Sequence, residues 1–399
     1  MRAPICYGVV QTGPHLPDGI PCVRVVDLSD PALSTRRMLR TSTEIHNEYR
    51  RTQLERDDIL FALRGDIGFV RLTPGHLAGA NLTRGIARLA VDQTKADPRY
   101  VYQAVQGPTT RRAIRLRING SALKEVPIEA LRTVPIPLPS HPVQRCIAKA
   151  LQDWDTGIET MNRLLRGRRK QKRGLLQQLL TGERRFPEFR DQPWVERRVG
   201  EVLQETSRLV DWNDNELYRL ASIRRGSRGL FDRGSLCGRD IKVKKLHTIR
   251  EGDFLISHIQ AAYGAMGTVP AEFDGAKVSD MYSILTPTTP GSIDMRFVNY
   301  LSQRKEMRHM AYLSSNGFFA ERLRLNFDPH DFLNRKILLP PTVEEQSKVA
   351  DVLETLDREI ELLTDLHEAL REQKKGLLQQ LLTGKVRVPA SMLKEAAHA

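Results

Sequence analysis

Apolar residues recur at helical spacing over two long stretches of the chain. In the first stretch they follow one another at intervals of 4, 3, 4, 3 and 4 residues: Ile147, Leu151, Trp154, Ile158, Met161 and Leu165. In the second stretch the same alternation links Val349, Leu353, Leu356, Ile360, Leu363, His367 and Leu370. This alternation is typical of a coiled-coil seam. Prolines precede both stretches and a Thr-Gly pair follows each, so we expect two long helices that end near Gly182 and Gly384.

The two predicted helices belong to an internal repeat. Residues 171–187 read QKRGLLQQLLTGERRFP and residues 373–389 read QKKGLLQQLLTGKVRVP, which are identical at 13 of 17 positions with an offset of 202. The same offset continues upstream without a gap to Pro139 and Pro341, and it matches Gln144 with Gln346. Because the offset is about half of the 399 residues, we expect two similar halves in tandem.

The two helices carry opposite charge. Residues 144–173 contain nine basic and three acidic residues, whereas residues 344–372 contain three basic and ten acidic residues. Complementary seams predict that the helices pack on each other within one chain, and an antiparallel pair would give a pseudo-twofold arrangement. Two unrelated surface helices would leave both the seams and the charge difference unexplained. The basic tract 163–173 could contact phosphate or pair with the acidic helix, and the matching charge favours the pairing.

The segments outside the helices are mixed in pattern. Short β-rich runs at 58–63 and 253–257 are punctuated by Gly and Pro, which predicts strands. The halves also resemble each other here, as RDDILFALRG against EGDFLISHIQ and DPRYVYQAV against DMRFVNYLS. We therefore expect an α+β fold, with two α/β domains separated by two long helices that pair as an antiparallel coiled coil. The expected parts are 1–138 and 194–339 (domains), 139–185 and 340–389 (helices), 186–193 (linker) and 390–399 (tail).

Composition indicates the class of partner. The chain has 62 Lys and Arg against 48 Asp and Glu, a formal charge of +14, which favours a polyanionic partner such as nucleic acid. With 28% charged and 40% hydrophobic residues, a globular protein is expected. No apolar run approaches the roughly 18–20 residues that span a bilayer, the N-terminus lacks a secretory core, and the four cysteines are scattered. We expect a cytoplasmic protein with structural thiols and no membrane contact.

Sequence motifs of catalysis do not occur in the chain. The stretch 383–386 reads TGKV and fails the last position of a P-loop, and there is no HExxH, GxSxG or dinucleotide motif. The Asn/Asp-Pro-Pro-Tyr tetrapeptide of amino-methyltransferases is missing as well, and the Asp240-Ile241-Lys242 stretch lacks the upstream Pro-Asp of a nuclease. We expect no catalytic residues, no metal site and no cofactor in this chain.

Basic clusters in both domains are the candidate DNA-binding residues. We identify Arg36, Arg37, Arg111, Arg112, Arg115, Arg117, Arg224, Arg225, Arg228, Lys242 and Lys244. Alternation in TRRAIRLRI predicts a strand with Arg115 and Arg117 on one face. Lys and Arg supply phosphate contacts, Arg can bind guanine at two points, and Gln260, Asn81 and Asn316 are of the types that read adenine. Each could be a solvated surface residue, but clusters in both domains favour DNA binding.

Helix length predicts the kind of target. A helix of about 35 residues spans roughly 50 Å, which is comparable with one to one and a half turns of DNA at about 34–36 Å per turn. Two different readers on a rigid spacer would recognise two short half-sites separated by a gap of fixed length. Because the two domains differ in sequence, the target should not be a palindrome.

These residues resemble the specificity subunits of type I restriction–modification systems. The resemblance covers almost the whole chain and rests on two recognition segments that alternate with the paired QKxGLLQQLLTG helices. IPLPSHPVQRCIAKAL and LLPPTVEEQSKVADVL look like the usual start of the family's helices, and WVERRVGEV at 194–202 looks like the usual start of a target-recognition domain. The first domain begins at Met1 with a sequence that resembles a later position of such a domain, so its opening is expected to be incomplete.

The resemblance implies a subunit that binds double-stranded DNA without catalysing a reaction. Each target-recognition domain would read one half of a bipartite, asymmetric target, and the helices would set the spacing. Two methyltransferase (modification) subunits and restriction/translocase subunits would join the complex, and these partners would use S-adenosylmethionine, ATP and magnesium.

Other kinds of protein stay open on the sequence alone. A non-catalytic interaction scaffold would bind DNA weakly and without sequence preference. A recognition module of a fused restriction–methylation polypeptide is disfavoured by the missing catalytic motifs, and RNA binding is disfavoured because aromatic residues make up only 6% of the chain.

Overall fold

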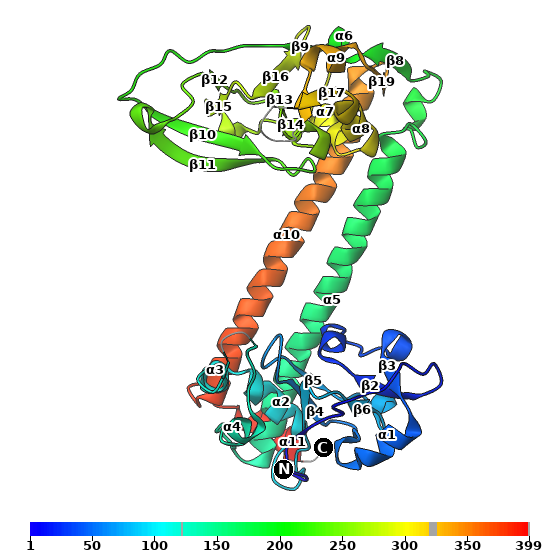
Figure 1. Ribbon diagram of the computed structural model, residues 1–399, viewed down its shortest axis with the longest axis vertical. Helices are drawn as coiled ribbons and strands as arrows, with labels where there is room; N and C mark the ends of the chain where they lie inside the picture. The colour runs from blue at the N-terminus through cyan, green and yellow to red at the C-terminus, as the bar shows by residue number, and fades with distance from the viewer. Residues whose placement is uncertain (121–122, 319–324, 398–399) are drawn as a thin grey trace. The chain divides into compact units, whose positions relative to one another are not determined.

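The computed structural model describes residues 1–120, 123–318 and 325–397, apart from the side chains of residues 316–318, 325 and 394–397. The chain divides into two compact units (Figure 1). Unit 1 consists of Met1–Arg163 and Thr364–Ala399, and unit 2 consists of Leu164–Leu363. Two long helices, α5 (His141–Leu179) and α10 (Val343–Leu382), each contribute to both units. Gly182 and Gly384 follow these helices with φ near +70°, as expected for glycines that terminate a helix.

Unit 1 contains two small sheets. One is antiparallel with the strand order β1-β7-β4-β5, and the other has the order β3-β2-β6, in which β2 pairs parallel with β6. The strands are β1 (Cys6–Tyr7), β2 (Ile20–Val23), β3 (Leu39–Thr41), β4 (Ile59–Ala62), β5 (Val70–Leu72), β6 (Asn81–Leu82) and β7 (Ile86–Leu89). Strand β4, which the run at 58–63 predicted, is completely buried, because helices cover one face of its sheet and the second sheet covers the other.

Unit 2 repeats this topology with longer strands. Its sheets have the orders β14-β13-β16-β9 and β11-β10-β15-β12, so β13 takes the place of β4 and β10 takes the place of β2, again with a parallel neighbour. The strands are β8 (Val195–Arg198), β9 (Leu203–Glu205), β10 (Leu217–Ile223), β11 (Leu230–Cys237), β12 (Leu246–Thr248), β13 (Phe254–Ser257), β14 (Met266–Thr268), β15 (Lys277–Ser279), β16 (Tyr282–Pro287), β17 (Ser315–Phe318), β18 (Leu325–Phe327) and β19 (Lys336–Leu339). Strand β1 of unit 1 holds the sheet position of β9, which β8 and a short helix precede in unit 2.

Each unit also contains short helices. In unit 1 they are α1 (Thr43–Glu48), α2 (Pro98–Gln106), α3 (Pro108–Arg115), α4 (Ile128–Arg132) and α11 (Ala390–Ala397). In unit 2 they are α6 (Val199–Val202), α7 (Met295–Ser302), α8 (Lys305–Leu313) and α9 (Pro329–Asn334). The similar stretches DPRYVYQAV and DMRFVNYLS form α2 and α7, and the side chains of Asp97 and Asp294 cap these helices by accepting hydrogen bonds from backbone N–H groups.

The strand predicted for TRRAIRLRI is wrong. Most of this stretch lies in α3, which begins at Pro108 directly after Gly107. Proline is favoured in the first turn of a helix, and in α3 only Thr110 and Ile114 are buried, four residues apart on one helical face. Arg115 therefore ends the helix, and Arg117 lies beyond it rather than beside it on a strand face.

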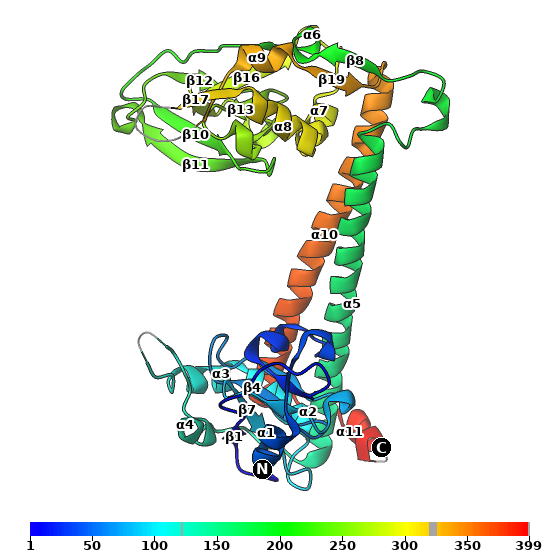
Figure 2. The same cartoon turned by 45° about the vertical axis from the view of Figure 1, so that its right-hand side comes forward.

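Within each unit the two long helices run antiparallel, side by side in both views (Figures 1 and 2). In unit 1, Asp155 of α5 accepts from the Lys374 Nζ of α10 at 2.6 Å. In unit 2, Lys172 of α5 pairs with Asp357 of α10. Lys172 and Lys374, like Asp155 and Asp357, differ by the repeat offset of 202, so the two ion pairs are equivalent. The antiparallel pairing predicted from the seams is confirmed.

The predicted seam residues face away from solvent, and Ile147 and Leu151 pack in the core of unit 1 while Val349 and Leu353 pack in the core of unit 2. All twelve are buried or half-buried: Ile147, Leu151, Trp154, Ile158, Met161, Leu165, Val349, Leu353, Leu356, Ile360, Leu363 and Leu370. The basic tract 163–173 pairs in part with the acidic helix, as predicted, because Arg168 lies 2.7 Å from Glu359 and Lys172 contacts Asp357. The predicted linker 186–193 contains a short 3-10 helix, Pro187–Phe189, whose Phe189 is buried.

A glutamine joins the sheet-containing part of each unit to a long helix. In unit 1, Gln144 Oε1 accepts from the Asp97 N–H at 2.9 Å while its Nε2 donates to the Pro139 carbonyl at 2.7 Å. In unit 2, Gln346 makes the equivalent bonds to the Asp294 N–H at 3.0 Å and the Pro340 carbonyl at 3.3 Å. Both glutamines are buried, so the repeated residue has the same structural role in each half.

Candidate nucleic-acid interface

Unit 2 presents a tight basic turn at residues 224–229, between β10 and β11. The backbone of this turn is fixed to the loop after β13, because Gly226 N donates to the Tyr263 carbonyl at 2.9 Å and Ser227 N donates to the Gly264 carbonyl at 2.7 Å. Ser227 has φ of 51°, and its hydroxyl donates to the Ser302 carbonyl at 2.8 Å. A left-handed residue of this kind is held by its surroundings, so the turn has one defined shape.

Arg225 in this turn has a defined orientation. Its guanidinium carbon lies 4.7 Å from the centre of the Tyr263 ring, and its Nε donates to Gln260 Oε1 at 3.3 Å. Tyr263 ends a short 3-10 helix, Ala261–Tyr263, and its side chain is 60% exposed. The structure thus brings together two predicted site residues, Arg225 and Gln260. It also adds Tyr263, which no motif or periodicity in the sequence indicated.

The other predicted residues of unit 2 divide into two groups. Arg224 and Arg228 share the turn with Arg225: Arg224 Nη1 donates to the Leu230 carbonyl at 2.6 Å, and Arg228 Nε donates to the Arg225 carbonyl at 3.0 Å. Lys242 and Lys244 are exposed on a separate loop, where Lys244 Nζ lies 3.0 Å from Asp214 Oδ1.

The loop around Lys244 is held by a polar cluster. Hydrogen bonding from the Trp212 indole, together with the ammonium of Lys244, lowers the pKa of the Asp214 carboxyl. Asp214 therefore stays ionised and keeps a negative charge next to Lys244. This reduces the attraction that Lys244 can exert on a phosphate, so Lys242 is the stronger phosphate-binding candidate of the two.

In unit 1 the exposed candidates lie on two separate elements. Arg36 and Arg37 are exposed in a 3-10 helix, Thr35–Arg37, which the Ser34 hydroxyl caps by accepting from the Arg36 N–H. Arg112 and Arg115 are exposed on α3. These four arginines extend into solvent and suit contacts to phosphate.

Two predicted arginines of unit 1 are engaged within the protein, Arg111 by partial burial and Arg117 by hydrogen bonds. Burial lowers the pKa of Arg111, and the nearby Arg115 lowers it further. Arg117 Nε donates to the Thr133 hydroxyl at 2.9 Å and its Nη1 donates to the Ala113 carbonyl at 2.8 Å. Arg117 therefore stabilises the end of α3. Because these hydrogen bonds occupy its guanidinium, it is a weaker DNA-binding candidate than its position in a basic run suggested.

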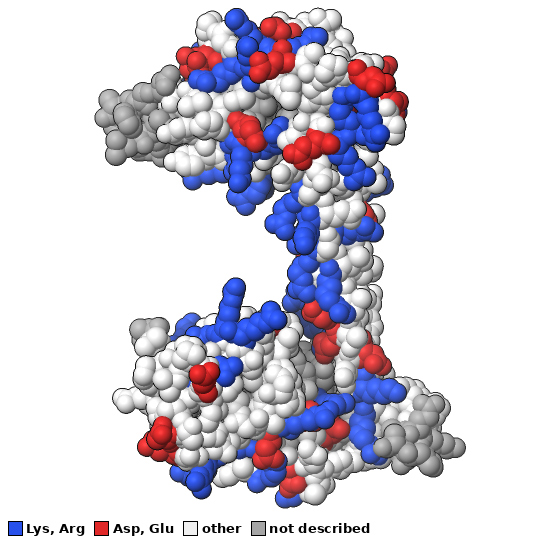
Figure 3. Space-filling model, turned by 90° about the vertical axis from the view of Figure 1, so that its right-hand side faces the viewer, with Lys and Arg blue, Asp and Glu red and all other residues white. Residues whose placement is uncertain are grey.

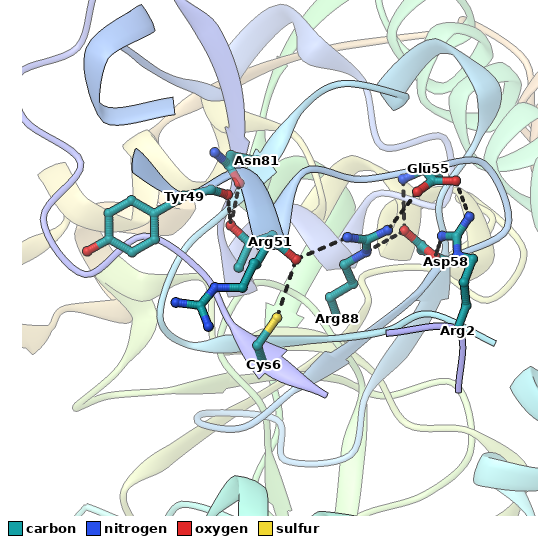
Figure 4. Close-up of polar contacts among 9 residues, drawn as sticks. Arg2, Cys6, Tyr49, Arg51, Glu55, Asp58, Asn81 and Arg88 are labelled. Atoms are coloured by element: carbon teal, nitrogen blue, oxygen red, sulfur yellow. Dashed lines mark hydrogen bonds and ion pairs between the residues drawn. The ribbon is translucent and has the colours of Figure 1, made fainter. Parts of the chain in front are cut away.

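Asn81 belongs to a buried polar network (Figure 4). Asn81 is fully buried, and its Oδ1 lies 2.6 Å from the Thr52 hydroxyl. The prediction that Asn81 reads a base is therefore wrong, because its amide faces the interior. The side chain of Asn316 lies outside the described residues.

The same network contains a buried ion pair. Arg88 Nε donates to Asp58 Oδ2 at 2.6 Å, Arg2 Nη2 donates to Asp58 Oδ1 at 3.0 Å, and both side chains of the Arg88–Asp58 pair are almost fully buried. Unit 2 has a counterpart in Arg208, which binds both oxygens of Asp253 at 2.6 and 3.0 Å. Asp58 and Asp253 occupy matching positions directly before β4 and β13. These charged groups stabilise the sheets and are not available to a ligand.

Basic side chains also line the helices. In the face shown by Figure 3, Lys and Arg gather along the long helices and on both units. On α5 the exposed ones include Arg163, Arg169, Lys170 and Arg173.

Across the described ranges, no group of three His, Cys, Asp or Glu could hold a metal ion, and no helix is long and apolar enough to cross a membrane.

Two units with equivalent sheets, each with exposed basic residues on its loops and short helices, define the class as a tandem repeat of two mixed α/β units. Residues 17–166 match the family described as the type I restriction modification DNA specificity domain. The chain is 27% identical over 151 residues to the EcoBI specificity subunit of Escherichia coli, a match that covers 38% of this chain and 32% of that protein. It is 25% identical over 300 residues to the MjaVIII specificity subunit of Methanocaldococcus jannaschii, covering 69% of this chain and 67% of that protein.

A solved structure has the same fold. The type I restriction–modification S subunit from M. genitalium matches with a TM-score of 0.56 at 14% identity, covering 94% of this chain and 92% of that one. The resemblance predicted from the paired helices is confirmed: the chain is similar in sequence to specificity subunits of type I restriction–modification systems, and it shares the fold of one of them. The match with the E. coli subunit spans about a third of that relative's length, whereas the fold match spans nearly the whole chain.

Proposed function

We propose that this chain is the DNA-reading subunit of a type I restriction–modification complex and recognises a bipartite, asymmetric sequence, with one half-site per unit. The observation that carries this proposal is the internal repeat of topology. The first sheets of the two units have equivalent strand orders, the second sheets share three strands in the same order (β3-β2-β6 and β11-β10-β15), and both units have the same glutamine junction to a long helix. Their loops differ, however. The turn that holds Arg225 in unit 2 corresponds to a longer segment with Arg36 and Arg37 in unit 1. Equivalent scaffolds with different loops would read different half-sites.

We further propose that the two long helices determine the gap between the half-sites. Helix α5 has 39 residues and α10 has 40, which corresponds to about 60 Å of helix each at 1.5 Å per residue. The equivalent ion pairs Asp155–Lys374 and Lys172–Asp357 support a single register of the helix pair. A fixed register makes the spacing constant, and a constant gap of unread bases is the expected result.

The proposal includes the partners. Two methyltransferase subunits would dock on this chain, and restriction/translocase subunits would complete the assembly. S-adenosylmethionine, ATP and magnesium would act in those subunits, while this chain would contribute recognition and no catalytic group. The pseudo-twofold repeat supports two docking positions, since each half offers an equivalent arrangement of helix and recognition part.

Selection from random DNA tests the proposal. The chain is purified together with its methyltransferase subunit, and the complex selects duplexes from a random library in the presence of excess competitor DNA. We expect enrichment of one split sequence, with affinity at least about a thousandfold above that for unrelated DNA. A complex that binds all duplexes alike would contradict the proposal and favour a scaffold with only non-specific DNA binding.

A further inference from the structure

We propose that Arg225 reads a guanine in the half-site recognised by unit 2, in an orientation fixed by Tyr263 and Gln260. The inference rests on the proposed DNA-recognition function and names a base and a side chain for it.

The contacts of Arg225 leave one edge of its guanidinium unused. The Tyr263 ring covers one face at 4.7 Å, and Gln260 Oε1 accepts from the Nε at 3.3 Å. No acceptor among the described residues bonds Nη1 or Nη2. Two parallel N–H donors on one edge match the O6 and N7 acceptors of guanine in the major groove, and this is the commonest specific contact of arginine with DNA.

The position of Arg225 is fixed before any ligand binds. The hydrogen bonds from Gly226 to Tyr263 and from Ser227 to Gly264 and Ser302 join the turn to the neighbouring loop and helix. An arginine loses substantial side-chain entropy when a ligand immobilises it. Stacking on a ring and hydrogen bonding at Nε remove part of that loss in advance, which favours base readout over a loose phosphate contact.

Tyr263 is suited to hold an arginine at the surface. The aromatic rings of the other cation–π pairs in the described chain are buried or half-buried, whereas the Tyr263 ring is exposed. The Tyr263 ring contributes little to the core and instead contacts an exposed arginine. This supports a role at the ligand rather than in folding.

Unit 1 lacks the equivalent arrangement. The second residue after β2 is Val25, where unit 2 has Arg225 as the second residue after β10. The preceding Arg24 is bound by Asp27, through Nε at 3.1 Å and Nη2 at 2.9 Å, so its guanidinium is already satisfied. The inference therefore assigns this guanine to one half-site only, in agreement with an asymmetric target.

Atomic substitution in the DNA tests the inference. Each guanine of the selected target duplex is replaced in turn by 7-deazaguanine, which lacks the N7 acceptor, and binding by the complex of this chain with its methyltransferase subunit is measured. For the wild-type chain we expect one substitution in one half-site to weaken binding about 5-fold or more. Arg225→Lys keeps the charge but loses the two-point donor edge, so its binding should be weaker and insensitive to that substitution.

Matched variants separate this role from folding. Arg233→Lys changes an exposed arginine of β11 and should retain both the affinity and the sensitivity of the wild type. Tyr263→Leu leaves Arg225 in place but removes the ring, so it should reduce the sensitivity to the same 7-deazaguanine. If Arg225→Lys does not fold, Tyr263→Leu supplies the comparison.

Three results would overturn the inference. Uniformly weaker binding by Arg225→Lys with unchanged sensitivity would indicate a phosphate contact. A wild-type complex that tolerates every 7-deazaguanine, or selects a target without guanine, would exclude two-point readout while leaving the proposed function intact. A complex that selects no sequence at all would refute the proposed function, and the inference with it.

Discussion

Replacing Gln346 by alanine should loosen the junction between the sheet-containing part of unit 2 and α10. The side chain is 3% exposed and satisfies two backbone groups, the Asp294 N–H at 3.0 Å and the Pro340 carbonyl at 3.3 Å. Each buried group left without a partner costs about 1–3 kcal/mol, so Gln346→Ala should lower the free energy of unfolding of unit 2 by about 2–6 kcal/mol. Gln144→Ala should have the same effect in unit 1, where the two distances are 2.9 and 2.7 Å.

Hydrogen exchange with mass spectrometry, combined with denaturant titration, measures this effect unit by unit. In Gln346→Ala the amide at the start of α7 should exchange faster, because Asp294 donates it to the glutamine in the wild type. Gln379 is exposed on the same helix, so Gln379→Ala serves as control and should change stability by less than about 0.5 kcal/mol.

Either of two results would show that Gln346 does not hold this junction. A loss below about 0.5 kcal/mol in Gln346→Ala would mean that other groups or water replace the side chain without cost. An equal loss of protection in peptides of unit 1 would mean that the substitution acts on the whole chain and not on the local junction.

Three further predictions concern the core, the pH dependence and DNA binding. Asp58→Asn should destabilise unit 1 by up to about 3–5 kcal/mol because it removes the buried carboxylate that pairs with Arg88 and leaves only the exposed Glu55 as a counter-charge, and an unchanged denaturation midpoint would contradict this. Burial lowers the pKa of His258 below 6.5, so the unfolded chain takes up the proton first and unit 2 should lose stability as the pH falls through 6.5. His258→Gln should flatten this loss in a denaturation series from about pH 7.5 to 5.5, and an equal slope in both proteins would argue against it. Arg36→Ala should weaken binding to all duplexes alike and reduce the salt dependence by about one phosphate contact, whereas a changed sequence preference would assign Arg36 to base readout.

The long helices and their pairing could be predicted from the sequence because the signal is local and repeated. A seam with steps of 3 and 4, a glycine after each helix and complementary charge all indicate a pair of packed helices. The sequence matches between the two halves also correspond to equivalent positions in the structure. The aspartates before β4 and β13 are equivalent, and so are those that cap α2 and α7.

The error at α3 shows the limit of short patterns. The five alternating residues 114–118 of TRRAIRLRI fit a strand, but the proline at the start of the helix and the spacing of Thr110 and Ile114 fit a helix better once the core is known. In a run this short, periodicity alone does not separate the two structures.

The candidate site depended on contacts that no local pattern contains. Arg225 and Tyr263 lie 38 positions apart in the sequence and meet because β10 and β13 belong to neighbouring sheets. Asn81 has the chemistry of a base reader, yet its place on β6 buries it. Residue type predicted which side chains could recognise DNA, and tertiary packing decided which of them reach the surface.

The most direct test of the account is to co-express the chain with its methyltransferase subunit and map methylated adenines across the host genome. If the chain reads one half-site per unit, the methylated adenines should lie in a single split, non-palindromic motif whose two parts are always separated by the same number of unread bases. A stable complex that methylates a continuous or palindromic sequence, or that methylates without sequence preference, would contradict it.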